Sequence, residues 1–322
     1  MIILDGVYGK EEVTEPVLIE LINSKPLQRL KNISQFGIPE GYYYLNTFSR
    51  FEHSVGVMIL LRRLGAGLEE QIAGLLHDVS HTAFSHIVDW VFGNSLNEDF
   101  QDKELKNFIS KTNIPEILEK HGYDPSKTIS PENFSLLEKP APDLCADRVD
   151  YTLREIVLLH DKKDSDFIFK HLVNYDKGIV FDLPNAARLF AQYYLDFNRN
   201  HWCGPKTVSE WHIFSEILKT ALENNIISMN DFMEDDFFVI NLLLKSNNRE
   251  ITDRLNFLKS GFKAKYADDS DGIMIRKKFR WVDPHILLNG KMKLSESDDE
   301  YREIIEKERK YFENPPKIKI TL

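Results

Sequence analysis

An apolar run that ends in a histidine and an aspartate places the strongest constraint on this chain. Residues 72–76 read Ile-Ala-Gly-Leu-Leu, and His77 and Asp78 follow directly. The run has the character of a buried helix. Two ionisable side chains at the end of such a helix cost free energy unless they bind something. Two interpretations are open: His77 caps this helix and Asp78 caps the next, or the pair binds a metal ion.

Other residues of the chain extend the pair into a set of ligands. His53 lies upstream and Asp147 lies downstream. A mixed set of imidazoles and carboxylates suits a borderline or hard divalent metal, and it leaves positions open for water and phosphate oxygens. Four of the ten histidines lie between His53 and His86, a density that packing does not explain. We therefore expect one divalent metal ion, either Fe, Mn, Ni, Mg, Co or Zn.

Helical periodicity dominates the first 261 residues. We expect helices at Pro16–Asn23, Pro26–Ile33, His53–Leu64, Leu68–His77, His86–Val91, Lys103–Ser110, Pro142–Leu159, Ala186–Phe197, Val208–Glu223, Phe237–Leu244 and Arg249–Lys259. Short strands are expected at Met1–Leu4 and at 178–182. The sequence thus predicts a mainly α body over residues 1–261.

The character of the chain changes after Gly261. Strand-like or alternating segments are expected at 263–266, 276–280, 286–288 and 315–320, with a loop at 268–272 and a charged helix at Glu300–Phe312. We interpret residues 262–322 as a small α+β C-terminal region.

Composition argues against several classes of protein. The formal net charge of −10 argues against strong binding of duplex nucleic acid by its phosphates. Two cysteines, Cys145 and Cys203, give no disulfide framework, so a reduced, cytoplasmic setting is expected. The first residues are too short and too soon acidic for a signal peptide. No apolar run approaches the roughly 18 residues of a membrane span.

Five motifs, in order and with fitting gaps, carry a family resemblance. They lie at residues 3–9, 28–37, 50–56, 77–86 and 147–151. In these segments the chain resembles the HD-domain metal phosphohydrolases, and within them the branch of dNTP triphosphohydrolases typified by the sterile-alpha-motif/HD-domain protein. The resemblance implies an HD-domain helical bundle whose four metal ligands are His53, His77, Asp78 and Asp147.

Three residues after the His-Asp pair are candidates for catalysis. His86 and Asp89 stand at i and i+3, so the carboxylate can hydrogen-bond the imidazole and fix its tautomer. His81 follows His77 by four residues, and the two share a face if the helix continues. The resemblance implies that His81, His86 and Asp89 act on the phosphates and on the attacking or leaving oxygen. The alternative is that both histidines fill core or cap positions.

Two arginines are candidates for contacts to phosphate. By resemblance, Arg50 matches a phosphate-contacting arginine, and Arg148 stands where the family often has a phosphate-binding lysine. A polyphosphate needs such cations in addition to a metal. Alternatively, Arg148 pairs with Asp150 or Glu155 on a solvated face.

Three further positions are candidates for contacts to a sugar. Tyr151 and Glu155 follow Asp147 at i+4 and i+8, so all three project to one side of a helix. The family places a tyrosine and an acid near the sugar at these positions, and its glutamine that reads the 3′-hydroxyl matches Gln35. Alternatively, Gln35 is an ordinary loop amide.

The chain departs from the family pattern in two segments. Residues 96–98 read Leu-Asn-Glu where the family often has Thr-His-Glu. Residues 198–206 replace a family Tyr and His, and within them Arg199, His201 and Lys206 are candidates for an altered contact to phosphate or base.

Three classes of function remain open. The first is a triphosphohydrolase acting on (deoxy)nucleotides. The second is another phosphoesterase on the same scaffold, such as a nucleotidase or a cyclic-nucleotide or dinucleotide hydrolase. The third is a non-catalytic binder of nucleotides or nucleic acid.

The resemblance also implies a homodimer or a higher oligomer. The apolar stripe of Trp211, Phe214 and Ile217 fits either a subunit contact or the core.

Overall fold

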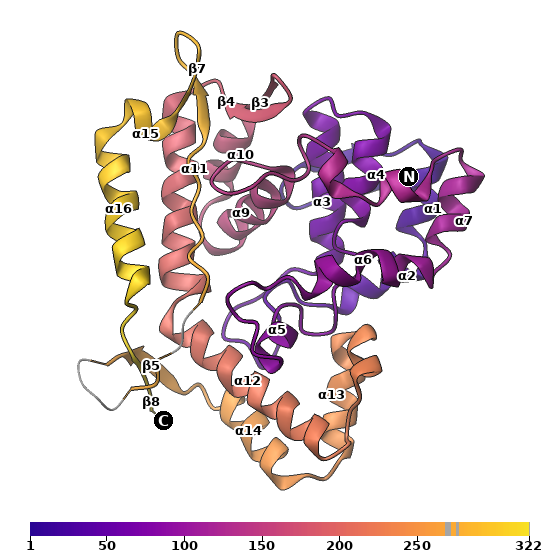
Figure 1. Cartoon of the computed structure of the whole chain (residues 1–322), viewed down its shortest axis with the longest axis vertical. Coiled ribbons are helices and arrows are strands. Elements are labelled where there is room, and N and C mark those ends of the chain that lie inside the picture. Colours follow the sequence, from indigo (N-terminus) through magenta and orange to yellow (C-terminus); the bar gives the residue numbers. More distant parts are fainter. Residues whose placement is uncertain (268–271, 275–276, 322) are drawn as a thin grey trace.

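Helices dominate the computed structural model, which describes residues 1–267, 272–274 and 277–321 (Figure 1). The predicted mainly α class is confirmed. The helices are α1 (Pro16–Ile22), α2 (Lys25–Arg29), α3 (Arg50–Arg63), α4 (Leu68–Leu76), α5 (Ile87–Val91), α6 (Phe100–Ser110), α7 (Ile114–Lys120), α8 (Pro125–Thr128), α9 (Ala146–Leu159), α10 (Lys162–Lys170), α11 (Pro184–Asp196), α12 (Pro205–Glu223), α13 (Asp236–Lys245), α14 (Arg249–Lys259), α15 (Leu294–Ser297) and α16 (Asp299–Glu313). Short 3₁₀ or π turns are η1 (Leu30–Asn32), η2 (Pro131–Asn133), η3 (Phe197–Trp202) and η4 (Met229–Met233).

The strands of the described residues form three small sheets. They are β1 (Ile2–Asp5), β2 (Gly9–Glu12), β3 (Leu172–Tyr175), β4 (Gly178–Phe181), β5 (Lys263–Tyr266), β6 (His285–Leu287), β7 (Lys291–Lys293) and β8 (Ile318–Thr321). β1 and β2 pair as an antiparallel hairpin, and β5 pairs with β8. The third sheet has the order β3-β4-β6-β7.

The third sheet joins the C-terminal region to the helical body. β6 runs parallel to β4, with Val180 opposite His285 and Phe181 opposite Ile286. Val282 and Tyr301 are buried in the same core as α3 and α9. The division into residues 1–261 and 262–322 stays a prediction, because these contacts link the two parts without showing whether either folds alone.

The segment 276–280 differs from its prediction. The described part, 277–280, forms no strand and belongs to none of the sheets. Residues 268–271 of the predicted loop and Arg276 lie outside the described residues. The basic side chains Lys277, Lys278 and Arg280 of this segment line a cavity.

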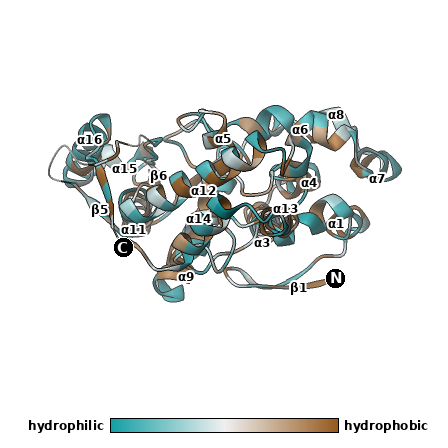
Figure 2. Cartoon of the chain, turned by 90° about the horizontal axis from the view of Figure 1, so that it is seen from below, coloured by the Kyte–Doolittle hydropathy of each residue, from teal (hydrophilic) through white to brown (hydrophobic). Residues whose placement is uncertain are grey.

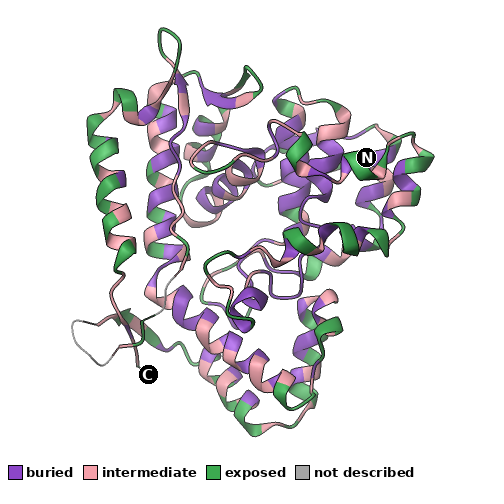
Figure 3. Cartoon of the chain, in the orientation of Figure 1, coloured by how far each residue is buried: buried purple, intermediate pink, exposed green. Residues whose placement is uncertain are grey.

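Helices α3, α4 and α9 form the centre of the body. α3 is buried along most of its length (Figure 3). It begins at Arg50, earlier than predicted, because Ser49 and Glu52 form a capping box. α9 packs closely against α3 at Gly56, where an added Cβ would lie 1.8 Å from Nη2 of Arg154. Glycine at this position lets a buried ion pair of α9 lie directly beside the backbone of α3.

The C-terminal helix α16 is largely polar. The residues of α16 are mostly hydrophilic (Figure 2), and its buried residues are Tyr301 and Ile305. The stripe of Trp211, Phe214 and Ile217 on α12 is buried in a second core, so the core explanation of that stripe is confirmed. None of the helices in the described part of the chain has the length and apolarity that crossing a membrane requires.

Candidate metal centre and active site

His53 lies in the first turn of α3, and its imidazole is completely buried. Its Nδ1 lies 2.8 Å from Oδ2 of Asp150, a carboxylate that also accepts hydrogen bonds from Arg154 and Tyr8. Because this carboxylate is an acceptor, Nδ1 carries a proton, and Nε2 is the nitrogen left to bind a metal ion. Metal-binding histidines are commonly oriented by a carboxylate in this way.

His77 follows directly after α4. Its Nδ1 lies 2.7 Å from the carbonyl oxygen of Gly74, which can only accept, so Nδ1 again carries the proton. Its Nε2 is buried and has no hydrogen-bond partner among the described residues. A buried ring nitrogen without a partner is unfavourable, and a metal ion would satisfy it.

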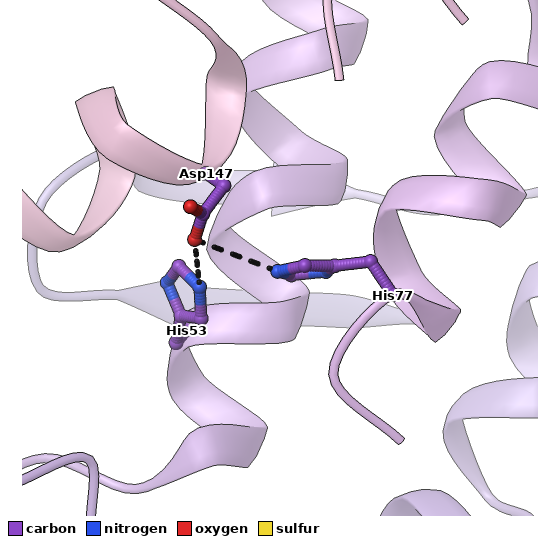
Figure 4. Close-up of side chains that lie close together, drawn as sticks. All are labelled: His53, His77 and Asp147. Carbon is purple, nitrogen blue, oxygen red and sulfur yellow. Dashed lines mark hydrogen bonds and ion pairs between the residues drawn. The ribbon is translucent and has the colours of Figure 1, made fainter. Parts of the chain in front are cut away.

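Asp147, in the first turn of α9, brings the two histidines together. Its Oδ1 lies 3.0 Å from Nε2 of His53 and 3.7 Å from Nε2 of His77 (Figure 4). Possible ligand atoms of these three residues all lie within 4.8 Å of one another. Asp78 completes the group, with carboxylate oxygens 3.6 Å from His53 and 3.5 Å from His77. These residues fit a divalent metal ion.

The electrostatics of this cluster favour a cation. Burial alone would lower the pKa of His77, but the carboxylates of Asp78 and Asp147 outweigh burial and raise it to about 10. Burial would raise the pKa of Asp147, yet His53 and His77 hold it well below its usual range. The same concentration of negative charge attracts a divalent ion, which would displace protons from the imidazoles.

Arg50 and His81 both contact Asp78. Nη1 of Arg50 lies 2.7 Å from Oδ2 of Asp78, and Nε of Arg50 donates to the hydroxyl of Ser85. Nε2 of His81 lies 3.3 Å from Oδ1 of Asp78. Burial and the charge of Arg50 lower the pKa of His81 to about 3, so this imidazole is neutral. Arg50 therefore holds Asp78 in place as well as lining the cavity.

The loop after Asp78 corrects one sequence-based expectation. α4 ends at Leu76, so His77 and His81 do not share a helix face. Phe84 and Ser85 have positive φ values of 63° and 49°. The carboxylate of Asp236 accepts the N–H of Phe84 at 2.7 Å and the N–H of Ser34 at 2.9 Å. This one side chain therefore ties the histidine loop to the segment that carries Gln35.

Replacing Asp236 with alanine should lower the free energy of unfolding. The variant leaves two buried N–H donors without an acceptor, at about 1–3 kcal/mol each. We expect a loss on the order of 2–6 kcal/mol in urea unfolding. Asp253→Ala is the control, because its carboxylate lies in an exposed pair with Arg249. Equal stability of the two variants would contradict the anchoring role of Asp236.

His86 and Asp89 lie beside the metal cluster and outside it. Nδ1 of His86 lies 3.3 Å from Oδ2 of Asp89, whose carboxylate is buried. The rings of His81 and His86 meet edge to face with centroids 5.1 Å apart. His86 lines the cavity and Asp89 lies behind it. The predicted pair is thus formed, with the carboxylate placed to orient the imidazole.

A cavity of about 690 Å³ opens onto the cluster. It is lined by all five predicted substrate-binding residues, namely Gln35, Arg50, Arg148, Tyr151 and Glu155. Oε1 of Gln35 is buried and has no hydrogen-bond partner among the residues that the structure describes. Tyr151 hydrogen-bonds Tyr194 through the two hydroxyls at 2.6 Å.

Two of these residues have partners that the sequence did not indicate. The carboxylate of Glu155 accepts hydrogen bonds from His201 at 2.9 Å and from Trp202 at 2.7 Å. Nη1 of Arg148 donates to the carbonyl oxygen of Asp143 and to Sγ of Cys145. The alternative pairing of Arg148 with Asp150 or Glu155 is not found among the described residues.

The segment 198–206 places one of its three candidates at the cavity. His201 lines it and lies 2.8 Å from the hydroxyl of Tyr43. Arg199 instead pairs with Glu308 at 2.8 Å. Lys206 donates to the carbonyl oxygen of Phe262 at 2.6 Å. A contact of Arg199 or Lys206 with substrate would require these partners to be given up.

Sequence reasoning missed several residues of the cavity wall. Glu138 lies near the cluster, and burial together with the charge of Asp147 raises its pKa to about 7. Glu98, noted only as a departure, pairs with Arg280 at 2.5 Å, while Lys277 and Lys278 lie beside them on the wall. In the sequence, the run of basic residues at 277–280 could have indicated that Lys277, Lys278 and Arg280 belong to the cavity wall.

Comparisons with known proteins agree with this geometry. The HD domain family model matches residues 50–155, the span from Arg50 to Glu155. The protein YdhJ of Bacillus subtilis, which is uncharacterised, is 39% identical over 90% of this chain and 90% of its own length. The metal-dependent phosphohydrolase cns2 of Cordyceps militaris is 33% identical over 69% of this chain and 67% of its own length.

Two further similarities are more limited. The human deoxynucleoside triphosphate triphosphohydrolase SAMHD1 is 30% identical over 44% of this chain, and the match spans 26% of that protein. The crystal structure of a hypothetical protein from Aquifex aeolicus superposes with a TM-score of 0.67 at 22% identity, covering 96% of this chain and 99% of that chain. The latter likeness concerns the fold.

Proposed function

The chain belongs to the HD-domain family of metal-dependent phosphohydrolases, and on this premise we propose that it hydrolyses (deoxy)nucleoside triphosphates to nucleoside and triphosphate. The observation that carries the proposal is one cavity that joins the metal cluster to cationic and aromatic side chains. The similarity to SAMHD1, a triphosphohydrolase by name, supports the same reaction.

The proposed ligands of the metal ion are His53, His77, Asp78 and Asp147. When bound, a divalent ion at such a centre supplies Lewis acidity toward a phosphoryl oxygen and water. Arg50 holds Asp78 in position by their 2.7 Å ion pair. In each histidine an acceptor holds Nδ1, so Nε2 is the nitrogen that would bind the ion once its proton is displaced.

The pair of His86 and Asp89 is proposed to transfer the proton. Water adds to the α-phosphorus, the bond from phosphorus to the 5′-oxygen breaks, and that oxygen must gain a proton. Asp89 orients His86 through Nδ1, so Nε2 of His86 remains available for the exchange. His81 is less suited to this step, because its Nε2 already faces Asp78.

The other walls of the cavity are proposed to hold the nucleoside. Phe36 and Tyr43 offer aromatic surface on which a base can stack. Gln35 and Tyr151 are proposed to contact the sugar, and Oε1 of Gln35 is an acceptor without a partner in the described structure. Arg148 is proposed to contact phosphate. Homodimerisation and a cytoplasmic location remain predictions.

Product analysis tests the reaction with dNTPs, NTPs and nucleoside monophosphates in Mn²⁺, Mg²⁺ or Co²⁺. We expect triphosphate as the product, and a preference for 2′-deoxynucleotides of about 10- to 200-fold in kcat/KM, because a packed sugar wall rejects one added hydroxyl by that much. Equal efficiency on GTP and dGTP would contradict the deoxynucleotide assignment. Phosphate released from monophosphates alone would favour a nucleotidase, and binding without turnover would favour a binder.

A further inference from the structure

Three cations of the C-terminal region reach into the cavity from a segment without regular structure. We call residues 277–280 the cationic segment. Its side chains Lys277, Lys278 and Arg280 all line the cavity. The segment is anchored by the backbone N–H of Arg280, which donates to Oδ1 of Asn198 at 3.0 Å. The cations are therefore held in place by the body of the protein.

The charges of this segment are only partly balanced. Arg280 pairs with Glu98 at 2.5 Å. Nζ of Lys277 donates to the carbonyl oxygen of Trp202 at 2.9 Å and lies 3.5 Å from the centre of the Trp211 ring. Nζ of Lys278 lies 3.4 Å from the carbonyl oxygen of Asn97. In the part of the chain that the structure describes, neither lysine forms an ion pair with a carboxylate.

Arg148 adds a fourth cation of the same kind. Its hydrogen bonds are to a carbonyl oxygen and to Sγ of Cys145, both neutral acceptors. It lies close enough to Lys278 for the two charges to interact. In the described part of the chain only Arg280 of these four cations forms an ion pair, with Glu98, while the carboxylates of Glu155 and Asp102 act on Lys277 and Lys278 from beyond ion-pair distance. Cations without a contacting carboxylate in a partly buried wall are unfavourable unless an anion completes them.

A comparison of these cations with Arg50 indicates what kind of anion they fit. Arg50 is already committed to Asp78, so it offers little uncompensated charge to a substrate. In the described part of the chain, Arg148 and the segment's Lys277 and Lys278 form no ion pair with a carboxylate. Arg148 directly follows the proposed ligand Asp147, so it connects the cluster with the segment. A single phosphate at the cluster would leave the segment unmatched, whereas a chain of phosphates can extend along the cavity that both line.

We propose that Lys277, Lys278 and Arg280 form an anion subsite for the phosphate groups that extend beyond the scissile phosphate of a polyphosphate substrate. This inference rests on the proposed function for the position of the scissile phosphate. It assigns to the C-terminal region a direct part in substrate binding. Substrates with one phosphate would bind without using this subsite.

The double variant Lys277→Ala/Lys278→Ala tests the subsite in the full-length, metal-loaded protein. Calorimetry with inorganic triphosphate as the probe should show binding weakened by at least about tenfold, because two charge-assisted contacts are lost. KM for nucleoside triphosphates should rise by a similar factor, with kcat changing less. Binding of inorganic monophosphate should change less than twofold.

A matched control uses two lysines on another wall of the same cavity. Lys103 pairs with Asp99 at 2.9 Å, and Lys106 lies 3.8 Å from Glu132. Lys103→Ala/Lys106→Ala should leave triphosphate binding within about twofold of the original protein. The single variant Lys278→Ala removes an exposed side chain, so it keeps the test valid if the double variant folds poorly.

The outcomes separate this inference from the proposed function. Unchanged triphosphate binding and unchanged KM in the double variant would overturn the subsite, even if nucleoside triphosphates are hydrolysed. An equal loss of triphosphate binding in the Lys103/Lys106 control would also overturn it, because the loss would then follow from removing positive charge anywhere in the cavity. If the protein binds inorganic triphosphate through the segment but hydrolyses no nucleoside triphosphate, the proposed reaction fails and the subsite stands.

Discussion

Asp78→Ala and His77→Ala should each lose the bound divalent ion and the hydrolytic activity together. Each variant removes one proposed ligand from a cluster in which the imidazole nitrogens and carboxylate oxygens lie 3.5–3.7 Å apart. Removal of an outer-shell partner alone typically weakens metal binding or activity by about 10- to 100-fold. Loss of a ligand should exceed that range, so we expect activity to fall by more than about 100-fold.

Elemental analysis of the purified variants checks this expectation directly. The control is His171→Ala, because His171 pairs with Asp182 at 2.8 Å and does not line the cavity. That variant should retain the metal content of the unmodified protein. A full metal complement in Asp78→Ala would show that Asp78 is no ligand, leaving His53, His77 and Asp147 as the candidate set.

The metal cluster could be predicted because its residues occupy helix ends. His53 lies in the first turn of α3, His77 follows α4, and Asp147 lies in the first turn of α9. Periodicity located these helices to within a few residues, and motif spacing identified the side chains. Polar residues at the ends of buried helices stand out in a sequence, because the runs beside them are apolar.

Partners of the site residues could not be predicted, because they depend on packing between distant segments. Glu155 lies 46 residues from His201 in the chain, and their ion pair follows from how η3 packs on α9. Likewise, the parallel pairing of β6 with β4 joins residue 285 to residue 180. A sequence pattern does not encode such register, which is why the strand predicted at 276–280 is wrong over its described part, 277–280.

The conformation of the loop after Asp78, which carries His81 and His86, likewise could not be predicted from its local sequence. A continuing helix would have aligned His77 with His81, yet the helix ends at Leu76. Positive φ at Phe84 and Ser85 is stabilised by Asp236, which lies about 150 residues further along the chain. Neither residue is a glycine, so the local sequence gave no indication of this conformation.

Substitution of His86 by alanine should cut turnover sharply while the metal ion stays bound. His86 lies outside the cluster, so its removal leaves all four proposed ligands in place. A positioned general acid or base contributes about 10²- to 10⁴-fold to a rate, and kcat should fall by that amount. KM should change less, because the walls proposed to hold the nucleoside are untouched.

Added imidazole provides the test that separates proton transfer from structure. If His86 transfers a proton, free imidazole in the vacated space should restore part of kcat in His86→Ala. Asp89→Asn keeps the imidazole but weakens its orientation, so its kcat should fall less than that of His86→Ala. A loss of less than about tenfold in His86→Ala, with metal retained and no rescue by imidazole, would assign the pair a structural role. Metal content measured in the same samples excludes loss of the ion as the cause.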